Sequence, residues 1–241
     1  MYARAVASSQ GWQWVVNGFR LFRRSPFMWI AFTLVLALIW MLSFAIPIIG
    51  PLIFNLLSPV FFAGLMLGCR TLEQGEDLEL GHLFSGFRTR AAALVTVGGV
   101  HLVGSIIIVG VFYAAAGGAS LNTVISAGRL PREAALNIML GLLMSLALYT
   151  PLLMLIWFAP LLVIFDDFAP VAAMRASFIA CCKNIMPFLL YSLVLLLFFI
   201  AAIPLLIGLL ILMPIVFCSI YASYTDIFVR EQRAVPGPAV G

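Results

Sequence analysis

Charged residues are missing from four long stretches of this chain, and their absence decides its class. The stretches run from Pro26 to Cys69, Ala91 to Gly128, Ala134 to Phe165 and Asn184 to Thr225, with lengths of 44, 38, 32 and 42 residues. A transmembrane helix needs about 20 apolar residues, so the first and last stretches can each cross a bilayer twice and the middle two once. Only 9% of all residues are charged, whereas soluble domains contain about a quarter. The sequence therefore predicts an integral membrane protein with six spans.

Motifs of enzymatic chemistry are also missing. The chain has no HExxH for a metalloprotease, no GxSxG for a serine hydrolase and no GxxxxGK[ST] for nucleotide phosphates. Its four cysteines form no CxxC pair, so neither a zinc site nor a disulfide framework is indicated. The basic residues behind the net charge of +4 are scattered beside span ends, so nucleic acid is not expected as a partner. We expect no catalytic residue, no cofactor and no metal, and hence a protein that is not an enzyme.

Six spans account for nearly the whole length of 241 residues. We predict an all-α membrane protein with a single transmembrane domain over residues 1–230 and a flexible C-terminal tail over 231–241. Six helices of about 20 residues and their connections leave no room for a soluble domain of ordinary size. The predicted spans cover residues 26–46, 52–69, 91–114, 136–160, 186–204 and 209–228.

Basic residues divide unequally between the two sides of the predicted bilayer. With six spans both termini share one side, which carries eleven of the thirteen Lys and Arg residues, whereas the other carries only Arg129 and Arg132. An excess of Lys and Arg in short loops marks the cytoplasmic side of a membrane protein. We therefore expect a multi-pass protein of the bacterial inner membrane with both termini in the cytoplasm.

A threefold pattern runs through the chain, in which a short basic stretch precedes each pair of spans. The stretches cover residues 11–24, 80–90 and 170–183, and the first two share Gly-Phe-Arg, at 18–20 and 86–88. We expect amphipathic helices in the headgroup layer, with apolar faces toward lipid and basic residues toward anionic headgroups. The pattern predicts three hairpins that enter from the cytoplasmic side, with the lipid bilayer and its anionic headgroups as partners. The predicted apolar faces are Trp12, Val15, Val16, Phe19 and Phe22 in the first stretch, and Val171, Met174, Phe178 and Cys182 in the third.

Small residues recur at a spacing that permits close helix packing. Gly64 and Gly68 form a GxxxG motif in the second span, and Gly141 and Ser145 form a similar pair in the fourth. Such pairs pack helices within one chain as well as between chains. The sequence therefore allows a homo-oligomer or a complex with another membrane protein, and it equally allows packing within one chain.

A few ionisable residues are candidates for a polar site. His101 falls near mid-depth of the third span, where it is a proton relay or ligand by default, or a neutral imidazole hydrogen-bonded across helices. Asp166 and Asp167 follow the fourth span; they can bind a divalent cation or act in acid–base chemistry, or they stabilise the start of the next helix through its dipole. No second intramembrane histidine or further acid is predicted nearby, so we favour the structural role for all three. Asp226 lies four residues before Arg230, which predicts an ion pair on one helix face.

Four segments of the chain carry a likeness to known proteins: GFRLFRRSPFMWI at 18–30, IPIIGPLI at 46–53, FAGLMLG at 62–68 and LLVIFDDFAPVAAMRASFIACCKNIMPFLLY at 161–191. With them the chain resembles a family of uncharacterised inner-membrane proteins of proteobacteria over most of residues 10–230. The last segment is loosely similar to the membrane domain attached to some glycerophosphodiester phosphodiesterases, whose catalytic domain is absent here. The resemblance implies the location and the all-α architecture, and it implies no activity and no site residues.

The sequence favours a non-enzymatic inner-membrane protein that handles lipids or supports a membrane assembly. The alternative is a small transporter or channel, which needs a water-filled path lined by polar groups. Beyond His101 the spans offer only scattered Ser, Thr and Asn for such a path. An intramembrane enzyme is a third alternative, and it would need a converging catalytic set that the sequence does not reveal.

Overall fold

The computed structural model describes residues 3–117, 132–204 and 206–229, and within these ranges every regular element is helical. The tail predicted over residues 231–241 lies outside the described residues. The two ends of the described chain lie side by side, because the Arg4 N–H donates to the Ile227 carbonyl at 3.2 Å. The elements are α1 (Gln10–Phe22), α2 (Pro26–Ser43), α3 (Ile49–Gln74), η1 (Leu80–Phe84), α4 (Ser85–Thr89), α5 (Ala91–Ala115), α7 (Arg132–Ile156), α8 (Ala159–Phe165), α9 (Pro170–Lys183), α10 (Ile185–Ala202), α11 (Leu206–Tyr224) and η2 (Thr225–Val229), which is a π-helical turn.

Six helical segments are long and apolar enough to cross a bilayer, which confirms the predicted all-α membrane fold. The largest differences from the predicted bounds are at the ends of the second and fourth spans, which continue five residues further, to Gln74 and Phe165. Helix α3 continues to Gln74 because Leu72 and Glu73 are good helix formers. It then stops at Gly75, whose φ of 86° is the left-handed conformation that glycine adopts at low cost. The segments are Pro26–Ser43, Ile49–Gln74, Ala91–Ala115, Ala134–Phe165, Ile185–Ala202 and Gly208–Val229.

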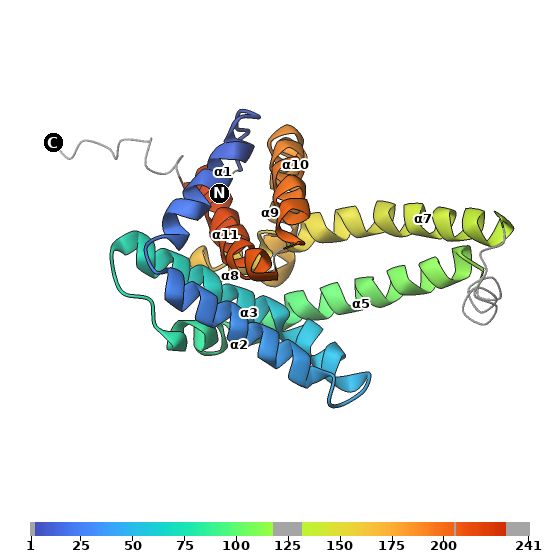
Figure 1. The fold of residues 1–241 in the computed structure, drawn as a ribbon, viewed down its shortest axis with the longest axis horizontal. Coiled ribbons are helices and arrows are strands. Elements are labelled where there is room, and N and C mark those ends of the chain that lie inside the picture. The colour runs from blue at the N-terminus through green and yellow to red at the C-terminus, as the bar shows by residue number, and fades with distance from the viewer. Residues whose placement is uncertain (1–2, 118–131, 205, 230–241) are drawn as a thin grey trace.

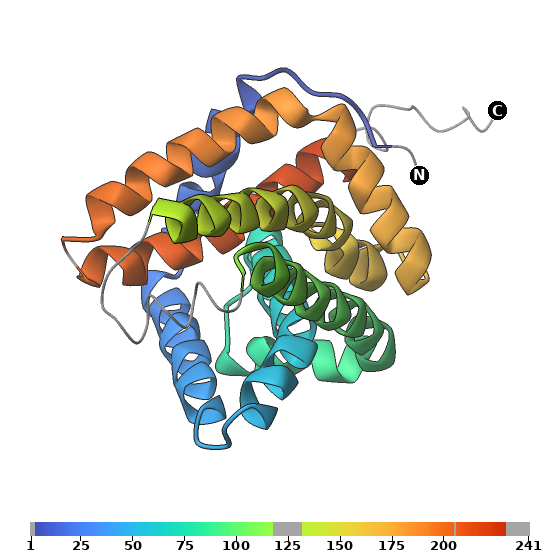
Figure 2. The same cartoon turned by 90° about the vertical axis from the view of Figure 1, so that its right-hand side faces the viewer.

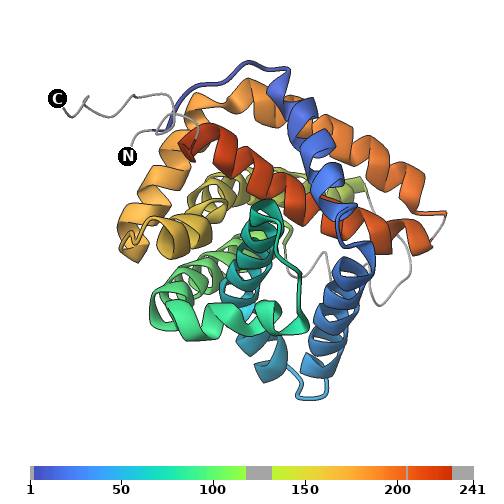
Figure 3. The ribbon, with the colours of Figure 1, turned by 90° about the vertical axis from the view of Figure 1, so that its left-hand side faces the viewer.

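The spans form three hairpins: α2 with α3, α5 with α7 and α8, and α10 with α11. Figure 1 shows α5 and α7 side by side and pointing away from α10, and Figure 2 shows the three hairpins diverging from a shared region. A shorter helix precedes each hairpin and packs on a different one. Helix α1 lies across α10 and α11 (Figure 3), η1 and α4 pack on α3, and α9 packs on α7 and α8. In cyclic order, each short helix therefore fastens the hairpin that follows it to the hairpin before it.

Equivalent small residues make these contacts in all three units. Gly18, from the first Gly-Phe-Arg, packs on α11 so closely that a Cβ there would lie 2.6 Å from the Ser219 nitrogen. Gly86, from the second, packs on the backbone of Val60 in α3. In α9 the corresponding residue is Ser177, which also precedes a phenylalanine and is fully buried. The third unit thus keeps a small residue where it lacks Gly-Phe-Arg.

The GxxxG motif is used within the chain. A Cβ on Gly64 would collide with the carbonyl of Leu83, which belongs to η1, and one on Gly68 would lie 2.8 Å from a methyl carbon of Leu78. Gly141 likewise faces α5, where Phe112 is its neighbour. These glycines pack elements of one chain together, so they carry no argument for a homo-oligomer.

The faces by which the short helices pack on the hairpins coincide only in part with the predicted apolar faces, and contact of their exposed apolar residues with lipid stays a prediction. In α1 the buried side includes Gly11, Trp14 and Gly18, whereas Trp12 and Phe19 are exposed. The helical pattern counted only large apolar residues and missed the glycines, which allow α1 to approach α10 and α11 closely. The buried face of α9 is also built largely of small residues: Ala173, Met174, Ser177, Ala180 and Cys181.

Candidate functional site

A cavity of about 520 Å³ lies between the three hairpins. Its walls come from α2 and α3, from α5, α7 and α8, and from α11, so all three hairpins contribute to it. The lining is apolar apart from Thr33, Ser58, His101 and the tryptophan N–H groups, and the two hydroxyls donate to backbone carbonyls of their own helices. The cavity can therefore accept an apolar molecule and offers few polar contacts. Its aromatic lining residues are Trp40, Phe54, Phe61, Phe62, Trp157 and Phe217.

The cavity lies at membrane depth and is exposed at one end. His101 stands ten residues from the start of α5 at Ala91, which is about 15 Å of helix and half of a ~30 Å hydrocarbon layer. At the rim, Trp40 is 51% exposed and Met213 is 39% exposed, whereas Leu65 in the wall is 2% exposed. The two rim residues belong to the halves of α2 and α11 nearest the turns of their hairpins. The exposed lining residues therefore lie toward the turns of the hairpins, on the side away from the described ends of the chain.

A break in the fourth span forms part of the wall. Helix α7 ends at Ile156 and α8 begins at Ala159. Trp157 in the break and Pro160 in the first turn of α8 line the cavity. Unpaired backbone groups at membrane depth are costly unless other protein groups satisfy them. The buried hydroxyl of Ser177 in α9 does so, since it accepts from the Phe158 N–H at 2.9 Å and donates to the carbonyl of Met154 at 2.7 Å.

Prolines interrupt the regular hydrogen bonding of the second span of each hairpin. Pro59 in α3 lines the cavity, and its missing N–H frees the carbonyl of Asn55. The hydroxyl of Ser58 donates to that carbonyl at 2.8 Å. Pro151 and Pro214 occupy the interiors of α7 and α11. Proline is more frequent in membrane-spanning helices than in soluble ones, because neighbouring groups such as the Ser58 hydroxyl satisfy the freed carbonyls.

His101 lines the cavity, which agrees with a functional role. The structural alternative predicted a hydrogen bond from His101 to another helix, and the Nε2 of His101 does not form one within the described ranges. Among the described residues, this nitrogen and the Nε1 of Trp157 are buried and have no hydrogen-bond partner. Both are covered by neighbouring side chains. A polar group of a ligand would therefore reach either nitrogen only after a side-chain rotation.

Asp166 and Asp167 do not line the cavity and do not act together. The Tyr224 hydroxyl donates to Asp166 at 2.6 Å, while Arg90 pairs with Asp167 at 2.6 Å. Burial raises the pKa of Asp166, and the hydrogen bond from Tyr224 opposes that shift. Helix α9 starts after Ala169 without a side-chain cap, so the aspartates join separate elements instead of capping it. Across the described ranges, no three His, Cys, Asp or Glu side chains lie close enough to hold a metal ion.

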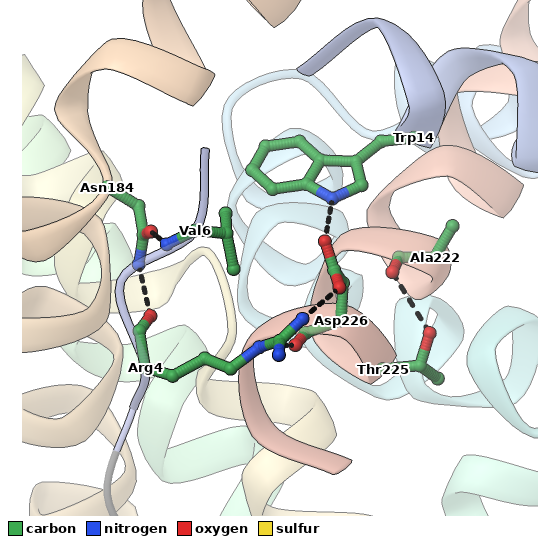
Figure 4. Close-up of polar contacts among 7 residues, drawn as sticks. All are labelled: Arg4, Val6, Trp14, Asn184, Ala222, Thr225 and Asp226. Carbon is green, nitrogen blue, oxygen red and sulfur yellow. Dashed lines mark hydrogen bonds and ion pairs between the residues drawn. The ribbon is translucent and has the colours of Figure 1, made fainter. Parts of the chain in front are cut away.

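Asp226, at the start of η2, is the most strongly engaged acid in the described chain. It is 3% exposed, pairs with Arg4 at 2.6 Å and accepts from the indole N–H of Trp14 at 3.0 Å (Figure 4). The Arg4 Nε also donates to the Asp226 carbonyl at 2.7 Å. The predicted partner Arg230 lies outside the described residues. Asp226 therefore joins three separated segments, whereas the sequence indicated only a local pair.

Asn184 fastens the same N-terminal arm, which we define as residues 3–9. Its side-chain oxygen accepts from the Val6 N–H at 2.8 Å, and its side-chain nitrogen donates to the Arg4 carbonyl at 2.9 Å (Figure 4). Lys183 adds a bond to the carbonyl of Ala3 at 3.2 Å. The arm is thus tied to the junction of α9 and α10 as well as to η2.

Comparison with known proteins supports the membrane assignment. The chain is 29% identical to a probable inner membrane protein of Burkholderia thailandensis, in a match that spans 96% of this chain and 95% of the relative. No protein-family model matches the chain, and no solved structure gives a significant match. The similarity is consistent with the resemblance to uncharacterised inner-membrane proteins, and nothing in it links the chain to glycerophosphodiester phosphodiesterases. With its six apolar helices, the chain is a multi-pass membrane protein in contact with the lipid bilayer.

Proposed function

We propose that this chain is a non-enzymatic protein of the inner membrane that binds a lipid, with an acyl chain of the lipid in the cavity between the hairpins. The observation that carries the proposal is the cavity itself, whose volume of about 520 Å³ and apolar lining suit a hydrophobic ligand. Ligand sites are commonly apolar clefts of ~300–1,000 Å³ with a few polar groups. Inside a bilayer the abundant ligand of that chemistry is lipid.

The position of the opening supports this proposal. An acyl chain can enter past Trp40 and Met213 without leaving the hydrocarbon layer, because both rim residues lie on spans. The inner-membrane location rests on the name of the Burkholderia relative and on the pattern of basic residues.

Transport of a small molecule is the second candidate, and His101 beside the cavity is the observation that favours it. Toward the described ends of the chain, the lining residues of α2 and α3 give way to Trp29, Phe32 and Cys69, which are fully buried. Transport would require these side chains to separate. Lipid binding needs no such movement, so it is the function that the geometry supports better.

A cavity-filling substitution tests lipid binding. Ala37 lines the cavity, and Ala37→Trp would place an indole in the space that the acyl chain needs. Leu34→Trp is the matched control, because Leu34 is on the same helix, is exposed and does not line the cavity. After purification in mild detergent, native mass spectrometry should find less lipid bound to Ala37→Trp than to the wild type and to Leu34→Trp. Equal lipid on all three proteins would contradict the proposal.

We also propose that both termini are cytoplasmic. The contact between Arg4 and Ile227 supports a shared side for the two ends, and eleven of the thirteen basic residues are assigned to that side. Alkaline phosphatase, which is active only outside the cytoplasm, should be silent when fused after Val235 and active when inserted within 117–120. The reverse pattern would overturn the orientation and leave the fold unchanged.

A further inference from the structure

A second pocket lies away from the cavity, near the described ends of the chain. It has a volume of about 250 Å³ and is enclosed by α1, α3 and the junction of α11 with η2. Unlike those of the cavity, most of its lining residues carry polar groups. Those that bear on its chemistry are Asn17, Arg20, Arg24, Glu73, Tyr221 and Thr225.

The two arginines leave most of their donors for a ligand. A guanidinium carries five N–H donors. One terminal nitrogen of Arg20 donates to the Asn17 side chain at 3.2 Å, and one of Arg24 donates to the carbonyl of Leu72. These bonds orient the guanidinium groups without neutralising either charge. Two guanidinium groups that line one pocket favour a phosphate, because its oxygens can accept two parallel bonds from a guanidinium fork.

Glu73 is the acid of this pocket, and it is already engaged. The Tyr221 hydroxyl donates to its Oε2 at 2.6 Å, which holds the carboxylate against α11. Two arginines and one glutamate give the pocket a net charge of +1. An anion is therefore attracted more strongly by the two arginines than it is repelled by Glu73. Neutralising an arginine should weaken the binding of the anion, and neutralising Glu73 should strengthen it.

The pocket also has the depth of the headgroup layer. Arg24 lies two residues before α2 begins at Pro26, and Glu73 is next to the last residue of α3. Thr225 directly follows α11. The ends of α2, α3 and α11 therefore meet at this pocket, and we infer that it lies near the level of the lipid phosphates.

We propose that this pocket is a phosphate-binding site. Its ligand is the phosphate of a lipid headgroup or of a small soluble phosphate ester, and Arg20 and Arg24 hold that group. The site is distinct from the acyl-chain cavity, because no residue lines both. The fully buried Phe32 and Cys69 stand between the two linings along α2 and α3, and on α11 the linings adjoin at Ile220 and Tyr221. Each site is thus testable without the other.

Single charge changes on lipid-stripped protein test the site. Native mass spectrometry compares phosphatidylglycerol with a phosphate-free glycolipid of the same acyl chains. Arg20→Gln should weaken the preference for phosphatidylglycerol about fivefold, as expected for the loss of one charge contact. Glu73→Gln should strengthen it, a gain that misfolding cannot produce, and its amide oxygen can still accept from Tyr221. Arg23→Gln is the control, because Arg23 lies over the Phe19 ring outside the pocket.

The source of the phosphate is distinguished by a second measurement on the same variants. If inorganic phosphate raises the thermal midpoint of the wild type, loses that effect in Arg20→Gln, and no lipid preference is seen, the ligand is a soluble phosphate ester. Equal losses in Arg20→Gln and Arg23→Gln would overturn the proposal, because they indicate general attraction to anionic lipid. A wild type that responds to neither probe would also overturn it. Ala37→Trp should leave the preference for phosphatidylglycerol and the response to inorganic phosphate unchanged. The proposal for the acyl-chain cavity and the proposal for this pocket can therefore fail independently.

Discussion

Replacing Gly18 with leucine is expected to undock α1 from α11 and to lower the stability of the protein severely. A Cβ at this position would lie 2.6 Å from the Ser219 nitrogen and 2.8 Å from the Ile215 carbonyl oxygen, both of which are backbone atoms of α11. Backbone atoms of a packed helix cannot rotate away as a side chain can. Overpacking a protein core costs ~1–3 kcal/mol of folding free energy and occasionally more. Because a whole leucine side chain would be added here, we expect a loss at the upper end of that range. The thermal midpoint in one detergent measures the effect.

The matched control for this substitution is Gly110→Leu in α5. No heavy atom lies within 4 Å of a Cβ added there, and glycine weakens a helix interior relative to leucine. Gly110→Leu should leave the midpoint unchanged or raise it slightly. If both substitutions had the same small effect, the close packing of α1 on the third hairpin would be wrong.

The transmembrane architecture was predictable because burying a charge in hydrocarbon costs much free energy. Membrane spans therefore appear as continuous uncharged runs in the sequence. A run such as Pro26–Cys69 excludes ions over 44 residues, and no tertiary contact is needed to interpret it. The packing of the short helices was not predictable by the same means. The buried face of α1 depends on Gly11 and Gly18, which allow close packing because they have no side chain. A pattern of large apolar residues does not detect such positions.

The candidate site could be predicted only in part. His101 was identified from its depth in a span, and it does line the cavity. The cavity itself is formed by residues from three hairpins that are far apart in the sequence. No local sequence pattern predicts that these hairpins come together. The role of Ser177 was missed, because it depends on the packing of α9 against the break between α7 and α8, which no local pattern predicts. Asp166 and Asp167 look like a pair in sequence but bond to different elements, because their side chains diverge after the end of α8.

Replacing Asp226 with alanine is expected to release the N-terminal arm and to destabilise the protein by about 2–3 kcal/mol. The substitution removes the ion pair with Arg4 and leaves the fully buried indole N–H of Trp14 without its acceptor. Because the Arg4 side chain is 37% exposed and can turn toward water, the loss should stay below that of a fully buried pair. Trypsin should cleave after Arg4 much faster, and hydrogen exchange in residues 3–9 should rise.

Asp167→Ala provides the comparison, because the pair of Asp167 with Arg90 has the same 2.6 Å separation but an acid that is 86% exposed. Exposed ion pairs contribute ~0–1 kcal/mol, since water screens the charges and holding the side chains costs entropy. Asp226→Asn should fall between the two alanine variants, because an amide oxygen can still accept from Trp14 while the attraction to Arg4 is lost. If Asp226→Ala and Asp167→Ala lowered the midpoint equally and left tryptic cleavage after Arg4 unchanged, Asp226 would not anchor the arm. The burial of the acid, and not the length of the ion pair, is what makes the two sites differ.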